Sequence, residues 1–317
     1  MKSSPLRIGT RDSKLALWQA QKVQTLLQEK NVFTEIVPVK SEGDLDLVTP
    51  LYAMGAQGVF TKTLDAYLLS NKIDIAVHSM KDVPTQLAQG IAAAAVLKRG
   101  NYKDVFVYKN EAVYKKYFCT NIDEQRLLEG IVATGSVRRK SQLLHRFPKL
   151  KIENLRGNVQ TRLRKLNENN WDGAIFATAG LERIDELPPT STEIDWMLPA
   201  PAQGAIMVVC REKDITTLDA IHSLNDLSTA LCTKIERDFL KTLMGGCSTP
   251  ISALAEIKED KLFFKGNILS LDGKEKMEVE KVADLSNADR LGISAANELL
   301  QMGADKLVMA IKNNFSL

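Results

Sequence analysis

The first hundred residues alternate between short apolar runs and segments with apolar residues at helical spacing. The runs at 6–9, 33–39, 73–77 and 91–96 are predicted strands. Two amphipathic helices are predicted between them, one through Ala16, Ala20, Val23 and Leu27, the other through Phe60, Leu64, Tyr67 and Leu68. Strands that alternate with helices imply a parallel sheet, so this part is predicted to be an α/β domain.

The same pattern begins again near residue 101, with predicted strands at 130–134, 151–155 and 173–177. A connector rich in proline and glycine, 198–204, then leads to another apolar strand at 205–210. After about residue 221 the pattern changes to one helix, three strand-like runs and a last helix that ends near Gly303. We expect a separate small α+β domain there.

Polar residues crowd the end of the predicted strand that begins at Ile73. This run stops in His78, Ser79, Lys81 and Asp82, and the proline at position 84 prevents a long helix. In open α/β sheets ligands bind beyond the carboxyl ends of strands, so these residues form a candidate site. The alternative is a solvated loop in which Lys81 and Asp82 only interact with each other.

Arginines stand in the predicted strand-to-helix turns, at Arg11, Arg138, Arg139 and Arg156, whereas Arg99 is expected at the surface. A turn into a helix directs backbone N–H groups at an anion, and guanidinium groups suit carboxylates or phosphates. In the first turn, Asp12 or Ser13 is expected to cap the helix instead. Because the sequence has no P-loop and no G-x-G-x-x-G pattern, carboxylates are at least as well supported as nucleotide phosphates.

Composition and net charge bear on which partners, compartment and metal sites we expect. The chain has 317 residues, 44% of them hydrophobic and 26% charged, and a net charge of +3 that does not indicate a nucleic-acid or membrane partner. No run is long enough to span a membrane and the N-terminus lacks the apolar core of a signal peptide, so we expect a cytoplasmic protein. The four cysteines are far apart without metal-type spacing, and with only three histidines no metal site is expected.

Cys247 differs from the other cysteines because it lies in a glycine turn. Cys210 and Cys232 occupy apolar segments, where a buried small side chain is the ordinary interpretation. A glycine turn could present a thiol to a cleft, but no histidine lies near Cys247 in the sequence to activate it. From the residues alone, a structural turn cysteine is the favoured interpretation.

Five motifs, in this order, resemble the porphobilinogen deaminase (hydroxymethylbilane synthase) family. They extend over nearly the whole chain and comprise IGTRDSKLALW at 8–18, DIAVHSMKDVP at 74–84, SVRR at 136–139, LRGN at 155–158 and GGC at 245–247. The resemblance implies two periplasmic-binding-protein-like α/β domains with a cleft between them, plus a small C-terminal α+β domain. The implied domain limits are 1–99 with 204–222, then 100–203, and finally 223–317, which carries the cofactor cysteine.

The resemblance also implies an activity. Four porphobilinogen molecules condense head to tail with loss of ammonia, and hydrolysis releases the linear tetrapyrrole hydroxymethylbilane. A dipyrromethane cofactor is implied on Cys247 through a thioether, which replaces the structural interpretation of that residue. Asp82 matches the catalytic aspartate. The implied cofactor-binding residues are Ser79, Lys81, Thr134, Ser136, Arg138, Arg139, Arg156 and Gln203, and the implied substrate-binding residues are Arg11, Ser13, Gln19, Arg156 and Arg162.

Two positions depart from the family pattern. Gln57 stands where the family usually has a lysine, and Gly135 stands where a hydroxyl residue is common. Neither departure affects Asp82 or Cys247.

We expect a monomer that acts on porphobilinogen and binds no nucleic acid. An anion-binding protein of the same fold and a thiol-dependent hydrolase using Cys247 are the alternatives.

Overall fold

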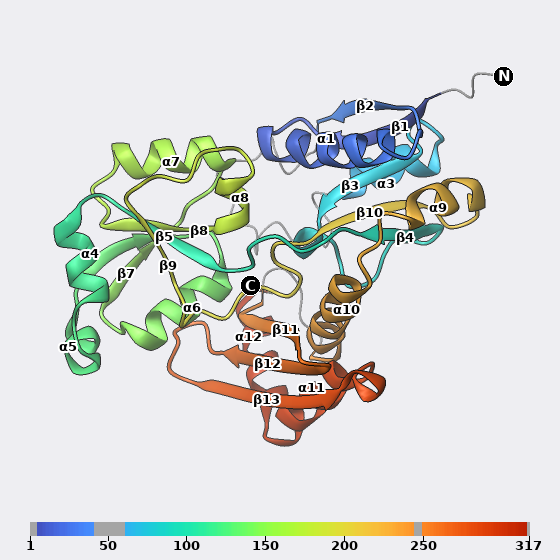
Figure 1. Cartoon of the computed structure of the whole chain (residues 1–317). Helices are drawn as coiled ribbons and strands as arrows, with labels where there is room; N and C mark the ends of the chain where they lie inside the picture. Colours follow the sequence, from blue (N-terminus) through green and yellow to red (C-terminus); the bar gives the residue numbers. More distant parts are fainter. Residues whose placement is uncertain (1–4, 41–60, 244–248, 316–317) are drawn as a thin grey trace.

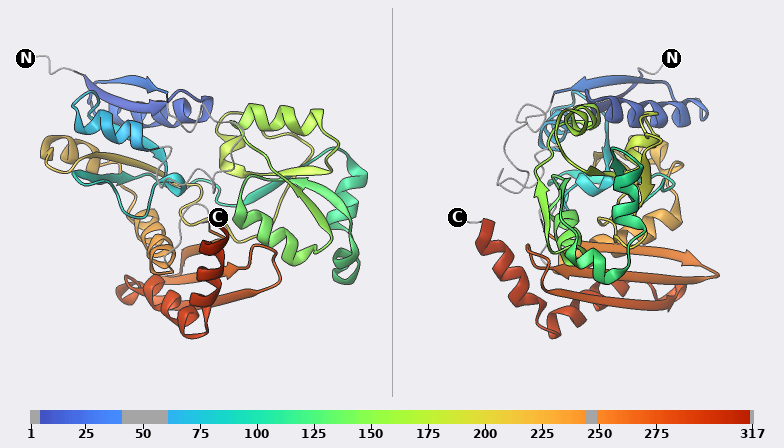
Figure 2. Two further views of the ribbon diagram at one scale, coloured as in Figure 1. Left: turned by 180° about the vertical axis from the view of Figure 1, so that it is seen from behind. Right: turned by 90° about the vertical axis from the view of Figure 1, so that its left-hand side faces the viewer.

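A computed structural model describes residues 5–40, 61–243 and 249–315 of the chain. Within these residues the strands form two five-stranded sheets and one three-stranded sheet. Each sheet is the centre of its own region, and the third region lies beneath the other two (Figure 1). The views from behind and from the side show the same arrangement (Figure 2).

The first sheet has the strand order β2-β1-β3-β10-β4. β1, β2 and β3 are parallel, whereas β10 is antiparallel to both β3 and β4. Its apolar residues are buried on both faces, under α1 on one side and α3 on the other. The elements of this region are β1 (Leu6–Arg11), α1 (Lys14–Gln28), β2 (Thr34–Val39), α3 (Lys62–Leu69), β3 (Ile75–Ser79), the 3₁₀ turn η2 (Met80–Asp82), β4 (Ile91–Val96), β10 (Ile206–Arg211) and α9 (Ile215–His222).

The second sheet repeats this topology with the order β7-β6-β8-β5-β9. β6, β7 and β8 are parallel, and β5 is antiparallel to its neighbours β8 and β9. The elements are β5 (Asp104–Tyr108), α4 (Glu111–Phe118), α5 (Ile122–Leu127), β6 (Gly130–Ala133), α6 (Val137–Arg146), β7 (Leu150–Glu153), α7 (Val159–Glu168), β8 (Gly173–Ala177), α8 (Thr178–Glu182) and β9 (Ser191–Glu193).

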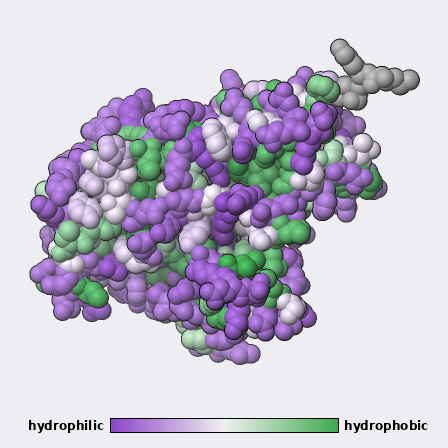
Figure 3. Space-filling view, in the orientation of Figure 1, coloured by the Kyte–Doolittle hydropathy of each residue, from purple (hydrophilic) through white to green (hydrophobic). Residues whose placement is uncertain are grey.

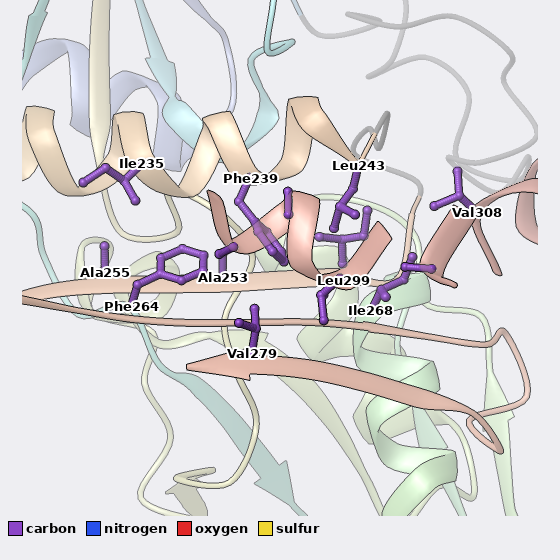
Figure 4. Close-up of a cluster of buried hydrophobic side chains, with 14 of the residues drawn as sticks. Ile235, Phe239, Leu243, Ala253, Ala255, Phe264, Ile268, Val279, Leu299 and Val308 are labelled. Carbon is purple, nitrogen blue, oxygen red and sulfur yellow. The ribbon is translucent and has the colours of Figure 1, made fainter. Parts of the chain in front are cut away.

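The third region packs helices on one antiparallel sheet, β11-β12-β13. Its core joins Ile235 and Phe239 to Leu299 and the sheet (Figure 4), and the rings of Phe239 and Phe264 meet edge to face at 5.2 Å. The elements are α10 (Leu227–Thr242), β11 (Ile251–Lys258), β12 (Lys261–Leu269), β13 (Lys276–Asp284), the 3₁₀ turn η3 (Leu285–Asn287), α11 (Leu291–Gln301) and α12 (Ala304–Phe315).

The predicted fold class, two α/β regions followed by a smaller α+β region, is confirmed. The prediction of purely parallel sheets is wrong, because β10 and β5 run against their neighbours. The alternation of strands and helices does not reveal strand direction when the chain leaves one sheet, builds another and returns. The pattern also did not predict α4, α5, α9, α12, β5 and β9. The proposed domain limits stay predictions.

Two crossing segments connect the first two regions, the stretch between β4 and β5 and the stretch between β9 and β10 (Figure 1). Gly100 and Gly204 link them, with the amide of Gly100 donating to the carbonyl of Gly204 at 3.1 Å. Among the described residues, no helix is long and apolar enough to cross a membrane.

Candidate active site

Arg138 and Arg139 lie in the first turn of α6, where both contact one buried carboxylate. Ser136 caps this helix by accepting from the amide of Arg139 at 3.4 Å. Asp104 accepts from Arg138 Nη2 through Oδ2 and from Arg139 Nη2 through Oδ1, each at 2.7 Å. Because β5 is antiparallel to β8, its first residue, Asp104, lies at the carboxyl end of the parallel strands, beside the start of α6.

One carboxylate thus serves two guanidinium groups, which leaves one positive charge in excess. Burial raises the pKa of Asp104, but the charges of Arg138 and Arg139, together with the hydrogen bond from Gln203 and the charge of Lys81, outweigh this effect and lower its pKa to about 2. Asp104 is therefore ionised at neutral pH. Burial lowers the pKa of Arg138, and its Nε atom is buried without a hydrogen-bond partner among the described residues.

Gln203 joins this arginine pair to the first sheet. Its Nε2 atom donates to Asp104 Oδ1 at 2.9 Å, and its Oε1 atom accepts from Lys81 Nζ at 3.2 Å. Lys81 belongs to η2, directly after β3. Burial, together with the positive charge of Arg139, lowers the pKa of Lys81 to about 8. A hydrogen-bonded chain therefore runs from the end of β3 to the beginning of α6.

A hydrogen-bonded pair, Gln19 and Ser79, lies at the carboxyl ends of the parallel strands of the first sheet. Gln19 of α1, which is buried, donates through Nε2 to Ser79 Oγ at 2.9 Å. Ser13 caps α1 by accepting from the amide of Ala16 at 3.4 Å, as expected for one of the two residues in that turn. In the second region, Thr134 Oγ1 accepts from the amide of Ser136 at 3.2 Å.

Charges from both sheets converge around Arg162 of α7. Its Nε atom donates to the carbonyl of Gly157 at 2.7 Å. Burial and the charges of Arg139 and Arg156 lower the pKa of Arg162 to about 10, while the carboxylate of Asp82 opposes this effect. Arg11, at the end of β1, also contributes to this field. The cations predicted from the separate turns therefore act on one place, which includes Asp82. In the space-filling view, hydrophilic side chains cover most of this face, including the place where the regions meet (Figure 3).

Some sequence-based expectations need correction. His78 is not part of the polar group, since it is buried within β3, and burial together with Arg11 lowers its pKa to about 4. Arg99 is not a surface residue. Its guanidinium donates to both carboxylate oxygens of Glu236, at 2.6 and 3.0 Å, and Glu236 is fully buried. Periodicity cannot reveal such a pair, because Arg99 is distant from its partner in the sequence.

Asp104 was not predicted as a site residue, because its arginine partners are also distant in the sequence. A charged residue at the beginning of an apolar strand, as in DVFVY, is the sequence signal that could have indicated it. Cys247 and Gln57 lie outside the described residues. Gly135 packs tightly, since a Cβ atom there would lie 2.5 Å from the carbonyl oxygen of Leu155. This turn has no room for the hydroxyl residue common in the family without a shift of its neighbour.

Comparison with known proteins identifies the family. The family model described as "Porphobilinogen deaminase, dipyromethane cofactor binding domain" matches residues 6–219, and "Porphobilinogen deaminase, C-terminal domain" matches residues 230–301. A relative named porphobilinogen deaminase, from Syntrophotalea carbinolica, is 39% identical over 316 residues, which is 98% of this chain and 97% of the relative. The chain belongs to the porphobilinogen deaminase family. The resemblance drawn from the five motifs is confirmed.

Solved structures that align with this family member include solute-binding proteins. An ancestral cationic amino acid solute-binding protein covers 69% of this chain and 87% of its own, with 14% identity and a TM-score of 0.45. A double mutant of the BvgS VFT2 domain from Bordetella pertussis covers 71% and 88%, with 13% identity and a TM-score of 0.40.

The described residues fit the cofactor that the family model names. A dipyrromethane with acetate and propionate side chains is an anion that needs several fixed cations. The site offers Arg138 and Arg139 with only one carboxylate between them, and the buried Arg138 Nε atom lacks a partner among the described residues. Lys81 adds a further cation through Gln203. An excess of buried positive charge is the condition under which a carboxylate ligand is stabilised.

Proposed function

We propose that this chain condenses four porphobilinogen molecules head to tail with release of ammonia, then frees hydroxymethylbilane by hydrolysis. The observation that carries the proposal is the hydrogen-bonded chain from Lys81, the neighbour of Asp82, through Gln203 to Asp104 and its two arginines. This chain brings cations from both α/β sheets to one place. Membership of the porphobilinogen deaminase family supports the same reaction. Each porphobilinogen adds an acetate and a propionate, so a growing chain needs the fixed guanidinium groups that this place supplies.

The cofactor would be held by a thioether to Cys247 and by polar groups from both sheets. These groups are Ser79, Lys81, Thr134, Ser136, Arg138, Arg139, Arg156 and Gln203. When bound, dipyrromethane supplies the terminal pyrrole carbon to which the first substrate is joined. The substrate carboxylates would meet Arg11, Ser13, Gln19, Arg156 and Arg162. Several of these residues also hold their own helix, as the capping bonds of Ser13 and Ser136 show.

Asp82 is proposed as the catalytic group. Loss of ammonia from porphobilinogen leaves an electron-poor pyrrole whose positive charge a carboxylate can stabilise as it develops. The same carboxylate can deliver a proton to the leaving amine and accept one after the carbon–carbon bond forms. Asp82 ends η2, a turn fixed by β3 on one side and by Pro84 on the other, so its backbone is well placed for this role.

Two variants, Asp82→Asn and Cys247→Ser, test the proposal beside the wild-type protein. Asp82→Asn keeps the shape but removes the charge, and single-turnover ammonia release should fall by more than roughly 10²-fold. The intact mass of the wild-type protein should exceed the sequence mass by a two-pyrrole adduct that reacts with Ehrlich's reagent, and Cys247→Ser should lack it. Near-normal release by the Asn variant, or an adduct mapped to Cys119, would contradict these assignments.

We further propose that the protein is a cytoplasmic monomer without a nucleic-acid partner, built from domains 1–99 with 204–222, 100–203 and 223–317. The small net charge of +3 supports the absence of a polyanionic partner. The place of β10 in the first sheet supports the discontinuous first domain. Light scattering during size-exclusion chromatography tests the monomer, and a mass of twice 35.2 kDa would contradict it.

A further inference from the structure

We propose that Arg237 is a positioning residue that holds the catalytic turn from the third region. The inference rests on the proposed role of Asp82 and adds to it. Arg237 lies on α10, which belongs to the region built on the third sheet, whereas Asp82 follows β3 of the first sheet. The two residues therefore come from elements far apart in the sequence, and no motif of the chain links them.

Arg237 donates to three main-chain carbonyls that flank Asp82 on both sides. Its Nη1 atom contacts the carbonyl of Val83 at 2.9 Å and that of Met80 at 3.4 Å, and its Nη2 atom contacts the carbonyl of Pro84 at 2.6 Å. A guanidinium group has its donors in one rigid plane, so three acceptors bound to it keep a fixed mutual geometry. Bonds from a charged donor are also stronger than neutral ones.

The turn itself has few internal restraints. η2 comprises three residues and is closed by one bond from the amide of Val83 to the carbonyl of Met80, at 3.1 Å. The amide of Met80 donates to Ala205 at 3.0 Å, which fixes the beginning of the turn to the connector before β10. Because Pro84 has no amide hydrogen, the far side of the turn depends more heavily on the bonds from Arg237.

The neighbouring residue on α10 fixes the helix to the same part of the molecule. Glu236 is fully buried and accepts from Arg99, from the amide of Ala202 at 2.6 Å and from the amide of Ala255 at 2.8 Å. It therefore ties α10 to both crossing segments and to β11. With α10 held in this way, Arg237 transmits a fixed position to the turn that carries Asp82.

This arrangement gives the third region a role in the chemistry. α10 ends at Thr242, and Cys247 follows five residues later in the sequence. The helix that precedes the proposed cofactor cysteine is thus the helix that holds the turn with the proposed catalytic carboxylate. We infer that Arg237 keeps Asp82 at a fixed position relative to the end of the growing pyrrole chain while successive substrates are added. Loss of Arg237 should therefore lower kcat more than it raises KM.

The test compares Arg237→Met, Arg237→Lys and the control Lys234→Met. Lys234 is an exposed cation on the same helix whose carboxylate partners, Asp238 and Asp289, lie in the third region. Arg237→Met should lower kcat by roughly 10²-fold, as expected for a displaced catalytic group, with little change in KM. Pyrrole content measured with Ehrlich's reagent should stay near that of the wild type. Arg237→Lys should recover part of kcat, and Lys234→Met should behave as the wild type.

A double-mutant cycle of Arg237→Met and Asp82→Asn separates an effect on the position of Asp82 from an effect on the stability of the whole protein. If Arg237 acts through Asp82, adding Arg237→Met to Asp82→Asn should lower ammonia release little further. Additive losses in the double variant, or wild-type kcat in Arg237→Met beside a defective Asp82→Asn, would overturn the inference and leave the proposed function standing. Near-normal release by Asp82→Asn would instead overturn the role of Asp82. Should Arg237→Met not fold, Arg237→Lys carries the same cycle.

Discussion

The buried carboxylate of Asp104 offers a sharp test of how the site is held together. Asp104→Asn keeps the size and shape of the side chain but removes its charge. In the native protein Oδ1 accepts from Arg139 and Gln203, and Oδ2 accepts from Arg138. An amide has one acceptor oxygen in place of two, so at least one guanidinium group loses its partner.

The structure gives the magnitude of this loss. Lowering the pKa of Asp104 from its ordinary value of 3.8 to about 2 corresponds to roughly 2 kcal/mol of stabilisation at neutral pH. A buried donor left without a partner adds about 1–3 kcal/mol. The sum, about 3–5 kcal/mol, agrees with the usual cost of removing one partner from a buried ion pair.

Thermal unfolding at pH 7 measures the effect. A loss of this size should lower the apparent melting temperature of Asp104→Asn by on the order of 10 °C. The matched control is Asp195→Asn, because Asp195 pairs with Lys103 but its side chain is 81% exposed. Such a pair contributes little, so the control should melt within about 2 °C of the wild type. If Asp104→Asn melted as close to the wild type as the control, the carboxylate would not be what holds the two arginines.

Three further changes follow from named contacts. Arg99→Leu leaves Glu236 buried without its cation and should cost about 3–5 kcal/mol in the free energy of unfolding, and a melting temperature near that of the wild type would contradict the pair. Gly135→Ser restores the family's hydroxyl residue but should lower the free energy of unfolding by about 1–3 kcal/mol, because its Cβ atom would lie 2.5 Å from the Leu155 carbonyl oxygen. Unchanged stability would show that the turn adjusts without cost. Burial opposes ionisation of Asp74, yet hydrogen bonds from Arg7 and Arg211 lower its pKa to about 2, so its stabilising effect is complete above about pH 4 and fades as the pH falls toward 2. Acid titration of unfolding should therefore be flatter in Asp74→Asn than in the wild type, and identical pH dependence would refute this role.

The sequence predicted what depends on local periodicity. Strands such as β3 and β6 stand out as apolar runs, and the polar residues after them correctly indicated where Lys81 and the arginines of α6 would lie. The capping role of Ser13 was also accessible, because a hydroxyl before an amphipathic run is a local signal. These features need only neighbouring residues, so one sequence was sufficient.

The partners of the charged groups were not predictable, because each lies far away in the sequence. Arg99 finds Glu236 at a separation of 137 residues, and Arg138 finds Asp104 at a separation of 34. Periodicity reports which face of an element is buried, not which charge faces it across a sheet. The same limit explains why the direction of β10 escaped prediction, since direction is set by the route of the chain through the second region.

The pairing of Arg138 and Arg139 with Asp104 bears on how the site can bind anions at all. A buried pair of guanidinium groups without a carboxylate would be too costly in the absence of ligand, whereas one carboxylate for each cation would leave no charge for a ligand. A single Asp104 between two arginines avoids both extremes, because it holds the pair in place and leaves positive charge over. Lys81 adds to this excess, and burial, together with the positive charge of Arg139, lowers its pKa to about 8. A bound carboxylate would raise that pKa again, so binding of the ligand and full protonation of Lys81 should favour each other.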